Sequence, residues 1–504
     1  MKKKHVFFLV LTFTLLLTGR LWIAGTGYLE DQDEFLYIWI HLHFADFVHL
    51  STWTNCMFDM QGQPPEIIIR LAQYISVLPI GQLTDKQMLH PDVLFFIGLY
   101  NICSSLLVLY VFYHILLKLK FSIELSIAGV ILLGTLFNFN LYTRHILPYD
   151  HALLFQLLAF NLLLRDEDRP RTILLAGLLS AIGLTNYYGS FMFIFINGGY
   201  LILRYYSIPL VAVKKCLLFI SPFILLALCY EVIARINGKS YLDFITQYYG
   251  TVYSEGSSNE GFAYLFLYFY LVEKWWGVVV LLLFSFGSYL LFTREGDVKI
   301  KQALFLGIIG YFIYGAYVFL FQKMVFEGRV LHIYYPFIVL GVLGFLQQQK
   351  LLPQNYFSLA ICIFAFANYG FVIKDFNGIG YPRNAIYKYH LFEDKEKTIL
   401  SFREEMGVCI PYSDRATSYI DSMGVPFLSP GKYVLRNICF LPHFPVDLLT
   451  TYCPWAKEEK DSVVFEQLHF QSHPAYVMEY CDHEGRDFYL QKQFKISVIK
   501  ISAP

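Results

Sequence analysis

Long apolar segments recur along most of this chain, and they constrain its fold more than any other feature. A membrane-spanning helix needs about 20 mostly apolar residues. Roughly eleven segments come near that requirement, namely 6–26, 93–117, 121–138, 149–164, 172–189, 190–206, 216–233, 276–293, 303–322, 330–347 and 355–373. The sequence therefore predicts a mainly α, polytopic transmembrane helical bundle with about 11 spans, formed by residues 1–373.

The composition supports a membrane protein and excludes some functions. Apolar residues make up 56% of the 504 positions and charged residues 15%, whereas soluble domains carry about 25% charged residues. The formal net charge is zero, so no bulk electrostatic attraction draws the chain to nucleic acid. We expect no nucleic-acid partner.

The N-terminus combines three lysines at residues 2–4 with an apolar run that begins at Val6. This pattern resembles a signal peptide, and a cleaved signal is the alternative interpretation. The apolar run resumes directly after Arg20, and no small-x-small cleavage site stands out. We expect a retained first membrane helix with its basic end in the cytoplasm.

The loops between the apolar segments separate by charge. Alternate loops carry basic residues, namely Lys118, Lys120, Arg165, Arg169, Arg171, Arg204, Lys214, Lys215, Arg294, Lys299, Lys301 and Lys350. The opposite loops include 27–92, 139–148, 234–275 and 323–329 and are richer in acids and aromatics. The positive-inside tendency places these loops and the region after 373 on the non-cytoplasmic side. We expect a multi-pass protein of a bacterial inner or cell membrane.

Residues 374–504 differ in character from the rest of the chain. Charges return, and Pro and Gly punctuate short runs. These runs predict a helix near 393–406 and strands at 408–412, 433–440, 475–480 and 488–501. We expect a small extracytoplasmic α/β domain, of a usual size for one domain.

Four of the nine cysteines lie in this C-terminal region, namely Cys409, Cys439, Cys453 and Cys481. The predicted topology places them in a potentially oxidising compartment, where an even number allows two disulfides with three possible pairings. Their spacing matches no zinc pattern.

Carboxylates cluster at the start of the first outer loop, directly after a membrane span. Residues 30–34 read Glu-Asp-Gln-Asp-Glu, a group that is costly near lipid unless it is solvated or functional. A solvated helix cap is the alternative, because acids favour a helix N-terminus. About 25 residues later Asp59 follows an aromatic residue, and Gln63 precedes a Pro-Pro pair that leads into an amphipathic stretch.

This order of motifs resembles the GT-C superfamily of glycosyltransferases, in particular the protein O-mannosyltransferases and the aminoarabinose transferases that modify lipid A. The resemblance covers the loop 30–80, a motif near 142–149 and the segment around Arg329. It implies an inverting enzyme that moves a sugar from a polyprenyl-phosphate donor to a glycan, lipid or protein acceptor on the non-cytoplasmic side. It also implies that Asp33 is the catalytic base and Glu34 its neighbour, with Asp31 as a competing assignment.

The chemistry of such a donor explains why these residue types are needed. A polyprenyl phosphate is already a good leaving group, so the enzyme mainly needs a carboxylate to take the acceptor proton and groups that hold the phosphate. At the position before Pro-Pro the mannosyltransferases have His and the aminoarabinose transferases have Lys, whereas this chain has Gln63. A neutral amide can hydrogen-bond the phosphate but supplies no charge, so cations must come from elsewhere.

Two arginines are the candidate phosphate ligands. Arg144 lies in Tyr-Thr-Arg-His-Ile-Leu-Pro-Tyr, which resembles the Ser-Arg…Tyr segment of related transferases, and Arg329 lies in a segment that resembles their Arg-Tyr…Pro element. Arginine suits bidentate phosphate contacts. The alternatives are that Arg144 reaches toward lipid headgroups and that Arg329 pairs with Glu327 or another acid.

The same motifs supply the candidate substrate-binding residues, namely His145, Tyr149, Asp59 and His332. We expect no cofactor. A metal site from His41, His43 and His49 with Asp46 is not favoured, because residues two apart on a helix face different sides. The chain also lacks a phosphate-cradling Gly-rich loop with Lys-Ser/Thr, which argues against ATP-driven transport.

Three other functions stay open. A membrane transporter or flippase of a lipid or sugar would carry ionisable groups within its spans and two similar halves; few such groups and no repeat are evident in the sequence. A non-catalytic GT-C relative is kept open by Gln63. An O-antigen polymerase or ligase would have a large Arg-rich late outer loop, whereas 234–275 and 323–329 are poor in Arg.

Overall fold

The protein is a bundle of helices followed by strands. The computed structural model describes residues 3–24, 91–145, 147–166, 169–236, 238–243, 245–246, 263–294, 296–321, 328–349 and 353–378, and in the C-terminal region 399–403, 408–411, 433–438, 463–471, 474–475, 478 and 493–500. Everything stated below about structure refers to these residues.

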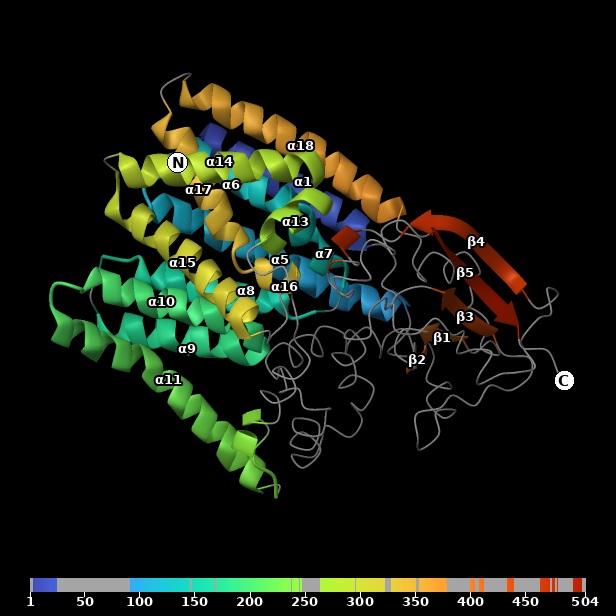
Figure 1. The fold of residues 1–504 in the computed structure, drawn as a ribbon, viewed down its shortest axis with the longest axis horizontal. Coiled ribbons are helices and arrows are strands. Elements are labelled where there is room, and N and C mark those ends of the chain that lie inside the picture. The colour runs from blue at the N-terminus through green and yellow to red at the C-terminus, as the bar shows by residue number, and fades with distance from the viewer. Residues whose placement is uncertain are drawn as a thin grey trace.

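The helices run in the order in which the apolar segments predict them (Figure 1). They are α1 (Lys3–Ala24), α5 (Pro91–Lys118), α6 (Ile123–Thr135), α7 (Phe137–Arg144), α8 (Tyr149–Leu163), α9 (Pro170–Asn186), η2 (Tyr188–Ser190), α10 (Phe191–Arg204), α11 (Pro209–Ile236), α13 (Ala263–Leu271), α14 (Lys274–Thr293), α15 (Val298–Phe321), α16 (Gly328–Leu331), α17 (Tyr335–Gln348) and α18 (Gln354–Gly378). A helix overlaps each of the predicted segments, and 262–272 is a separate short helix, α13.

The predicted number of spans is not confirmed. Among the described residues, six helices are long and apolar enough to cross a membrane, or seven if the bent pair α6 and α7 is one span. Four other predicted spans are helices of 15, 17, 14 and 14 residues, α8, α9, α10 and α17. At 1.5 Å per residue these are shorter than a hydrocarbon core of about 30 Å. The chain is nevertheless an integral membrane protein, because the six qualifying helices have mean hydropathies of 1.6 to 2.3.

Loops that carry basic residues meet at one end of the bundle. Lys120 pairs with Asp297 at 2.8 Å and Lys299 with Asp166 at 2.5 Å, and the Arg204 guanidinium donates to the Asp166 carbonyl at 3.2 Å. These contacts join the α5–α6, α8–α9, α10–α11 and α14–α15 connections. The structure thus brings the predicted cytoplasmic loops together, although exposed ion pairs of this kind each contribute only about 0–1 kcal/mol.

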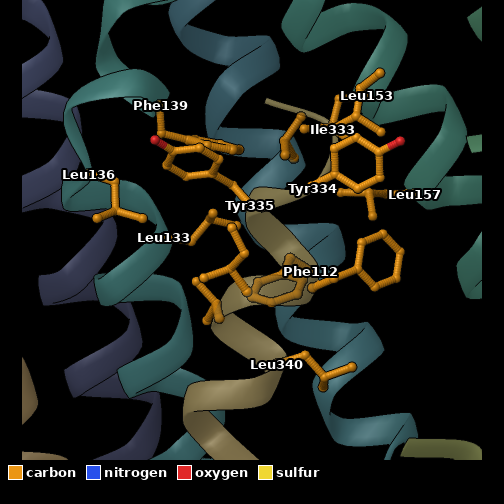
Figure 2. Packing of buried hydrophobic residues seen from close by; sticks show 14 of the residues in the cluster. Phe112, Leu133, Leu136, Phe139, Leu153, Leu157, Ile333, Tyr334, Tyr335 and Leu340 are labelled. Atoms are coloured by element: carbon orange, nitrogen blue, oxygen red, sulfur yellow. The ribbon is translucent and has the colours of Figure 1, made fainter. Parts of the chain in front are cut away.

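Helix α17 lies at the centre of the bundle. Its buried residues face all round the helix and run from Tyr335 to Leu346, as expected for a helix enclosed by others. Figure 2 shows how the segment around Tyr334 and Tyr335 packs among side chains such as Phe112, Phe139 and Leu153. This packing fixes the residues that immediately precede α17.

Helices α14 and α17 approach each other through glycines. A Cβ added at Gly287 would lie 1.9 Å from the Gly341 carbonyl oxygen and 2.8 Å from the Phe345 nitrogen. Neither backbone atom can move aside as a side chain can. Small residues at such contacts let helix backbones pack closely in a membrane, where lipid supplies no hydrophobic drive for helices to associate.

The C-terminal strands form one mixed sheet in the order β2-β1-β3-β5-β4. They are β1 (Ile399–Arg403), β2 (Val408–Pro411), β3 (Tyr433–Ile438), β4 (Val463–Gln471) and β5 (Gln493–Lys500). The pair β1 and β3 is parallel, and the other three pairs are antiparallel.

Three of the predicted strands are confirmed within their ranges, as β2, β3 and β5. The predicted helix at 393–406 is wrong for 399–403, because Ile399, Leu400 and Phe402 of β1 pair with β3 in the middle of the sheet. The predicted strand at 475–480 is wrong for Ala475 and Met478, which are helical, and β4 comes earlier in the chain. The side chains of the four C-terminal cysteines lie outside the described residues, so the disulfides stay a prediction.

We predict that Gly287→Ala destabilises the bundle, because the new methyl group would collide with the backbone of α17. Overpacking of this kind typically costs about 1–3 kcal/mol. Thermal unfolding of the detergent-solubilised protein should show a lower Tm. Gly370→Ala in α18 is the matched control, since a Cβ there meets nothing within 4 Å, and an equal Tm loss in both variants would contradict the close contact.

Candidate functional site

The predicted site residues fall into two groups. Asp33, Glu34, Asp59 and Gln63 lie outside the described residues, and so do the acids and histidines of the first loop. Their roles therefore stay predictions. Arg144 is the last residue of α7, and its side chain is also outside the described part of the chain.

The structure brings two of the predicted motifs together through Arg329 and Tyr149. The Arg329 Nη1 atom donates a hydrogen bond to the Tyr149 hydroxyl at 3.2 Å. The guanidinium carbon lies 5.9 Å from the centroid of the Tyr149 ring, within the range of a cation–π contact. These residues are 180 positions apart in the sequence, so α16 and the start of α8 form one site.

His332 joins the same two motifs a few residues away. Its Nε2 atom is 2.8 Å from the Asp150 Oδ1 atom, and its Nδ1 atom is 3.0 Å from the Asn138 Oδ1 atom. The ring stacks on Phe139 at 4.5 Å and meets the edge of Tyr142 at 5.1 Å. With an exposed fraction of 1%, His332 is enclosed and does not present its ring to a substrate in this arrangement.

Asn138 connects His332 to the residue before Arg329. Its amide nitrogen donates to the Tyr268 hydroxyl at 2.8 Å and to the Gly328 carbonyl at 3.1 Å. Helices α7, α13 and α16 therefore meet at one side chain. Arg329 follows directly after the anchored Gly328, and this places its backbone.

A sharp bend between α6 and α7 places Asn138 next to these partners. Helices α6 and α7 meet at an angle of 62°, because Leu136 is extended with φ −67° and ψ 144°. Thr135 and the residues before it belong to α6, so the predicted span 121–138 ends three residues early. The predicted outer loop 139–148 begins with the helix α7.

Glu273 caps the helix that starts after this break. Its carboxylate accepts the backbone N–H groups of Phe137 at 2.8 Å and Asn138 at 3.1 Å, and the Tyr335 hydroxyl at 3.0 Å. A carboxylate at a helix N-terminus is favourable because of the helix dipole. Glu273 lies in the link between α13 and α14, where burial raises the pKa of its carboxyl to about 7 while these hydrogen bonds lower it.

His145 is placed by its backbone. The Asn101 amide of α5 donates to the His145 carbonyl at 2.9 Å, and the His145 side chain is buried. The bend between α7 and α8 is thereby tied to α5. The same bend leads into Tyr149, which meets the edges of Tyr142 and Tyr187 at 4.7 Å each.

Arg20 of α1 is a buried residue whose role the sequence did not reveal. Its exposed fraction is 0%, and none of its three guanidinium nitrogens has a hydrogen-bond partner among the described residues. Tyr369 of α18 and Asp150 act on it electrostatically. The available signal was an arginine inside an apolar run, since ionisable residues within membrane spans are functional candidates by default.

Within the described part of the chain, no group of three or more His, Cys, Asp or Glu side chains could hold a metal ion. The residues of the candidate metal site, His41, His43, His49 and Asp46, lie outside that part. The chemistry that the described residues offer is a cation at Arg329, presented beside a tyrosine hydroxyl and supported by buried charges.

Neither a protein-family model nor a curated protein sequence matches this chain. Among solved structures, the fold is similar to the crystal structure of ArnT from Cupriavidus metallidurans bound to undecaprenyl phosphate, with a TM-score of 0.48 and 11% sequence identity. The likeness covers 71% of this chain and 62% of that one, so the match spans less than two thirds of the ArnT chain. A likeness of this size does not assign an activity.

We predict that Glu273→Gln destabilises the protein by about 1–3 kcal/mol, because the amide nitrogen of Gln would face a buried N–H group and leave it unsatisfied. Thermal unfolding in detergent measures the change. Glu124→Gln alters a half-exposed carboxylate, which pairs with His5 at 2.9 Å, and is the matched control. If Glu273→Gln and the control have the same Tm, Glu273 does not stabilise the protein as a helix cap.

Proposed function

We propose that this chain is a membrane glycosyltransferase of GT-C type. It transfers a sugar from a polyprenyl-phosphate donor to a glycan, lipid or protein acceptor on the non-cytoplasmic side. The observation that carries the proposal is the contact of Arg329 with Tyr149, because it joins two motifs that were each assigned to the site from the sequence alone.

The position of this contact supports the proposed sidedness. Arg329 precedes α17, whereas the other end of α17 meets the basic loops, where the Arg294 guanidinium donates to the Gln348 carbonyl at 2.8 Å. The candidate site and the basic loops therefore belong to opposite ends of the same helix. With the basic loops in the cytoplasm, the site opens to the other side.

The proposed reaction needs little from the protein beyond placement and charge. The acceptor hydroxyl oxygen attacks the anomeric carbon, the bond from that carbon to the phosphate oxygen breaks, and polyprenyl phosphate leaves with the electron pair. Asp33 takes the hydroxyl proton as general base, a contribution of about 10²–10⁴ in rate. Arg329, with Arg144 and Gln63, holds the phosphate as negative charge accumulates on it.

A transporter is the second candidate, and one structural finding favours it. The sequence indicated few ionisable groups within the spans, yet Arg20, Asp150 and His332 are all at most 2% exposed inside the bundle. Buried ionisable groups of this kind also mark ion and substrate pathways in transporters. The products formed by the purified protein distinguish the two functions.

The deciding experiment supplies the protein, in lipid vesicles, with polyprenyl-phosphate sugars and a mixture of acceptors, and examines the products by mass spectrometry. Transfer of a sugar that is lost in Asp33→Asn at unchanged protein level supports the enzyme. Movement of the lipid or sugar across the vesicle membrane without a covalent product supports transport instead. Unchanged transfer in Asp33→Asn removes Asp33 as the base.

We predict that Arg329→Lys lowers kcat/KM for the lipid donor at least tenfold, because lysine keeps the charge but loses the planar fork that grips a phosphate. Steady-state transfer rates at varied donor concentration give the value. Arg294→Lys changes an arginine at the opposite end of the bundle and should stay within about twofold of wild type. Equal effects in both variants would rule out a phosphate contact specific to Arg329.

A further inference from the structure

A short helical segment of the C-terminal region is buried among the helices of the bundle. Ala475 and Met478 are helical, and their exposed fractions are 0% and 1%. Residues three apart lie on the same face of a helix, so these two side chains form one buried face. Both belong to the hydrophobic core that the bundle helices form. In Figure 1 this short red segment lies at the helices, near α13.

The segment is joined to α13 by a hydrogen bond. The Tyr264 hydroxyl donates to the Met478 carbonyl at 2.9 Å, across 214 positions of the sequence. Tyr264 is itself fully buried. A buried carbonyl that loses its donor is costly, so the bond and the burial of Met478 support each other. The C-terminal segment is therefore seated on α13 by apolar packing and by a hydrogen bond.

This seating confines the C-terminal sheet. Strand β4 ends at Gln471, three positions before Pro474, and three residues extend over at most about 11 Å. The sheet is also connected to α18, from Gly378 to Ile399 of β1. These residues are 21 positions apart, and a chain of that length can extend over about 70 Å. The segment 474–478 therefore limits the distance between the sheet and α13 far more than the link from α18 does.

The face of α13 that holds the segment also reaches the candidate site. Tyr264 and Tyr268 are one turn apart on the same face of α13, and their ring centroids are 5.9 Å apart. The Tyr268 hydroxyl accepts the Asn138 amide at 2.8 Å, and the same amide donates to the Gly328 carbonyl at 3.1 Å. Arg329 follows Gly328 in the chain. A continuous series of contacts thus leads from the C-terminal segment to Arg329.

Helix α13 depends on such contacts for its position. It has nine residues, and isolated helices shorter than about 12 residues are marginal. Phe269 packs against Tyr335 of α17, with 5.0 Å between the ring centroids, and Tyr268 binds Asn138. Tyr264 holds the first turn to the C-terminal segment. Loss of that segment would remove one of the anchors of α13.

We propose that residues 474–478 dock the C-terminal region onto α13, and that Tyr264 is a positioning residue through which this docking holds Arg329 in place. With the segment docked, α13 is held from two sides, and Tyr268 keeps Asn138 and the adjoining backbone in position. The C-terminal region then supports the candidate site directly. The effect on Arg329 rests on the proposed function, whereas the docking does not.

Oxidation of Met478 measures the docking without any substrate. Hydrogen peroxide converts an accessible methionine to its sulfoxide, and a buried one reacts when the structure around it opens. The full-length protein in detergent is treated with peroxide, and tandem mass spectrometry locates the added oxygen on Met478. We expect this oxidation to be at least about tenfold slower in the folded protein than in guanidinium. Equal rates would overturn the proposal.

Tyr264→Phe tests the hydrogen bond. It keeps the ring and removes the hydroxyl that donates to the Met478 carbonyl, so the segment should open more often. We expect Met478 to be oxidised about fivefold faster than in wild type, or more. Tyr270→Phe is the matched control, because Tyr270 lies on the same helix and is 65% exposed. Equal oxidation rates in the two variants would overturn the role of Tyr264.

Ala475→Glu releases the segment by a second route. A carboxylate at this fully buried position would lack a partner, so the segment should leave α13, and Met478 should be oxidised nearly as fast as in the unfolded protein. Ala475→Gly adds no atoms and should stay within about fivefold of wild type. Slow oxidation of Met478 in Ala475→Glu would overturn the docking. If Ala475→Glu does not fold, Tyr264→Phe and its control decide the question.

The effect on Arg329 has its own readout. KM for the polyprenyl-phosphate donor should rise in the same order as the oxidation rate of Met478. In Ala475→Glu it should rise by about tenfold or more, since a displacement near 1 Å can cost on the order of 100-fold, and kcat should change less. An unaltered donor KM in a variant with fast oxidation would overturn the positioning role and leave the docking intact. If the wild-type protein transfers no sugar, the proposed function fails, while the oxidation rates still decide the docking.

Discussion

The capping of α7 by Glu273 is the interaction on which the rest of the site depends. The chain bends between α6 and α7. The first backbone N–H groups of α7 have no acceptor within their own helix, so they need a partner from elsewhere in the bundle. The carboxylate of Glu273 satisfies two of them and also accepts the Tyr335 hydroxyl. One side chain thus joins the bend to the start of α17. An unsatisfied buried N–H costs about 1–3 kcal/mol, so the bend and the carboxylate depend on each other.

From this cap a continuous set of hydrogen bonds leads to the candidate site. Asn138 is held at its backbone by Glu273 and at its side chain by Gly328 and His332. His332 in turn holds Asp150, and the neighbours of these anchored residues are Arg329 and Tyr149. A site attached to buried, hydrogen-bonded groups of this kind is more rigid than one built on an exposed loop. The part-buried contact of Arg329 with Tyr149, which would meet a phosphate, is therefore attached to a buried framework.

The sequence predicted the parts of this structure that depend on local pattern. A helix overlaps every long apolar segment, and the motifs around Tyr149 and Arg329 do meet. The parts that depend on distant partners were not predictable: Glu273 caps a helix 136 positions earlier in the chain, and no local signal marks it as a cap. Arg20 looked like a mere interruption of the first span, because its neighbourhood with Asp150 and Tyr369 exists only after folding. Near 399–403 the pattern favoured a helix, but pairing with β2 and β3 makes a strand.

The burial of Arg20 has a consequence for the order in which the protein assembles in the membrane. Asp150 follows Arg20 by 130 positions in the chain, so at about 5–20 residues per second it is synthesised on the order of ten seconds later. During that time an arginine four residues from the end of α1 can extend to the lipid headgroups. Insertion of α8 then brings the carboxyl group of Asp150 into the neighbourhood of the side chain, which turns inward. The final orientation of α1 thus depends on a helix that comes later in the chain.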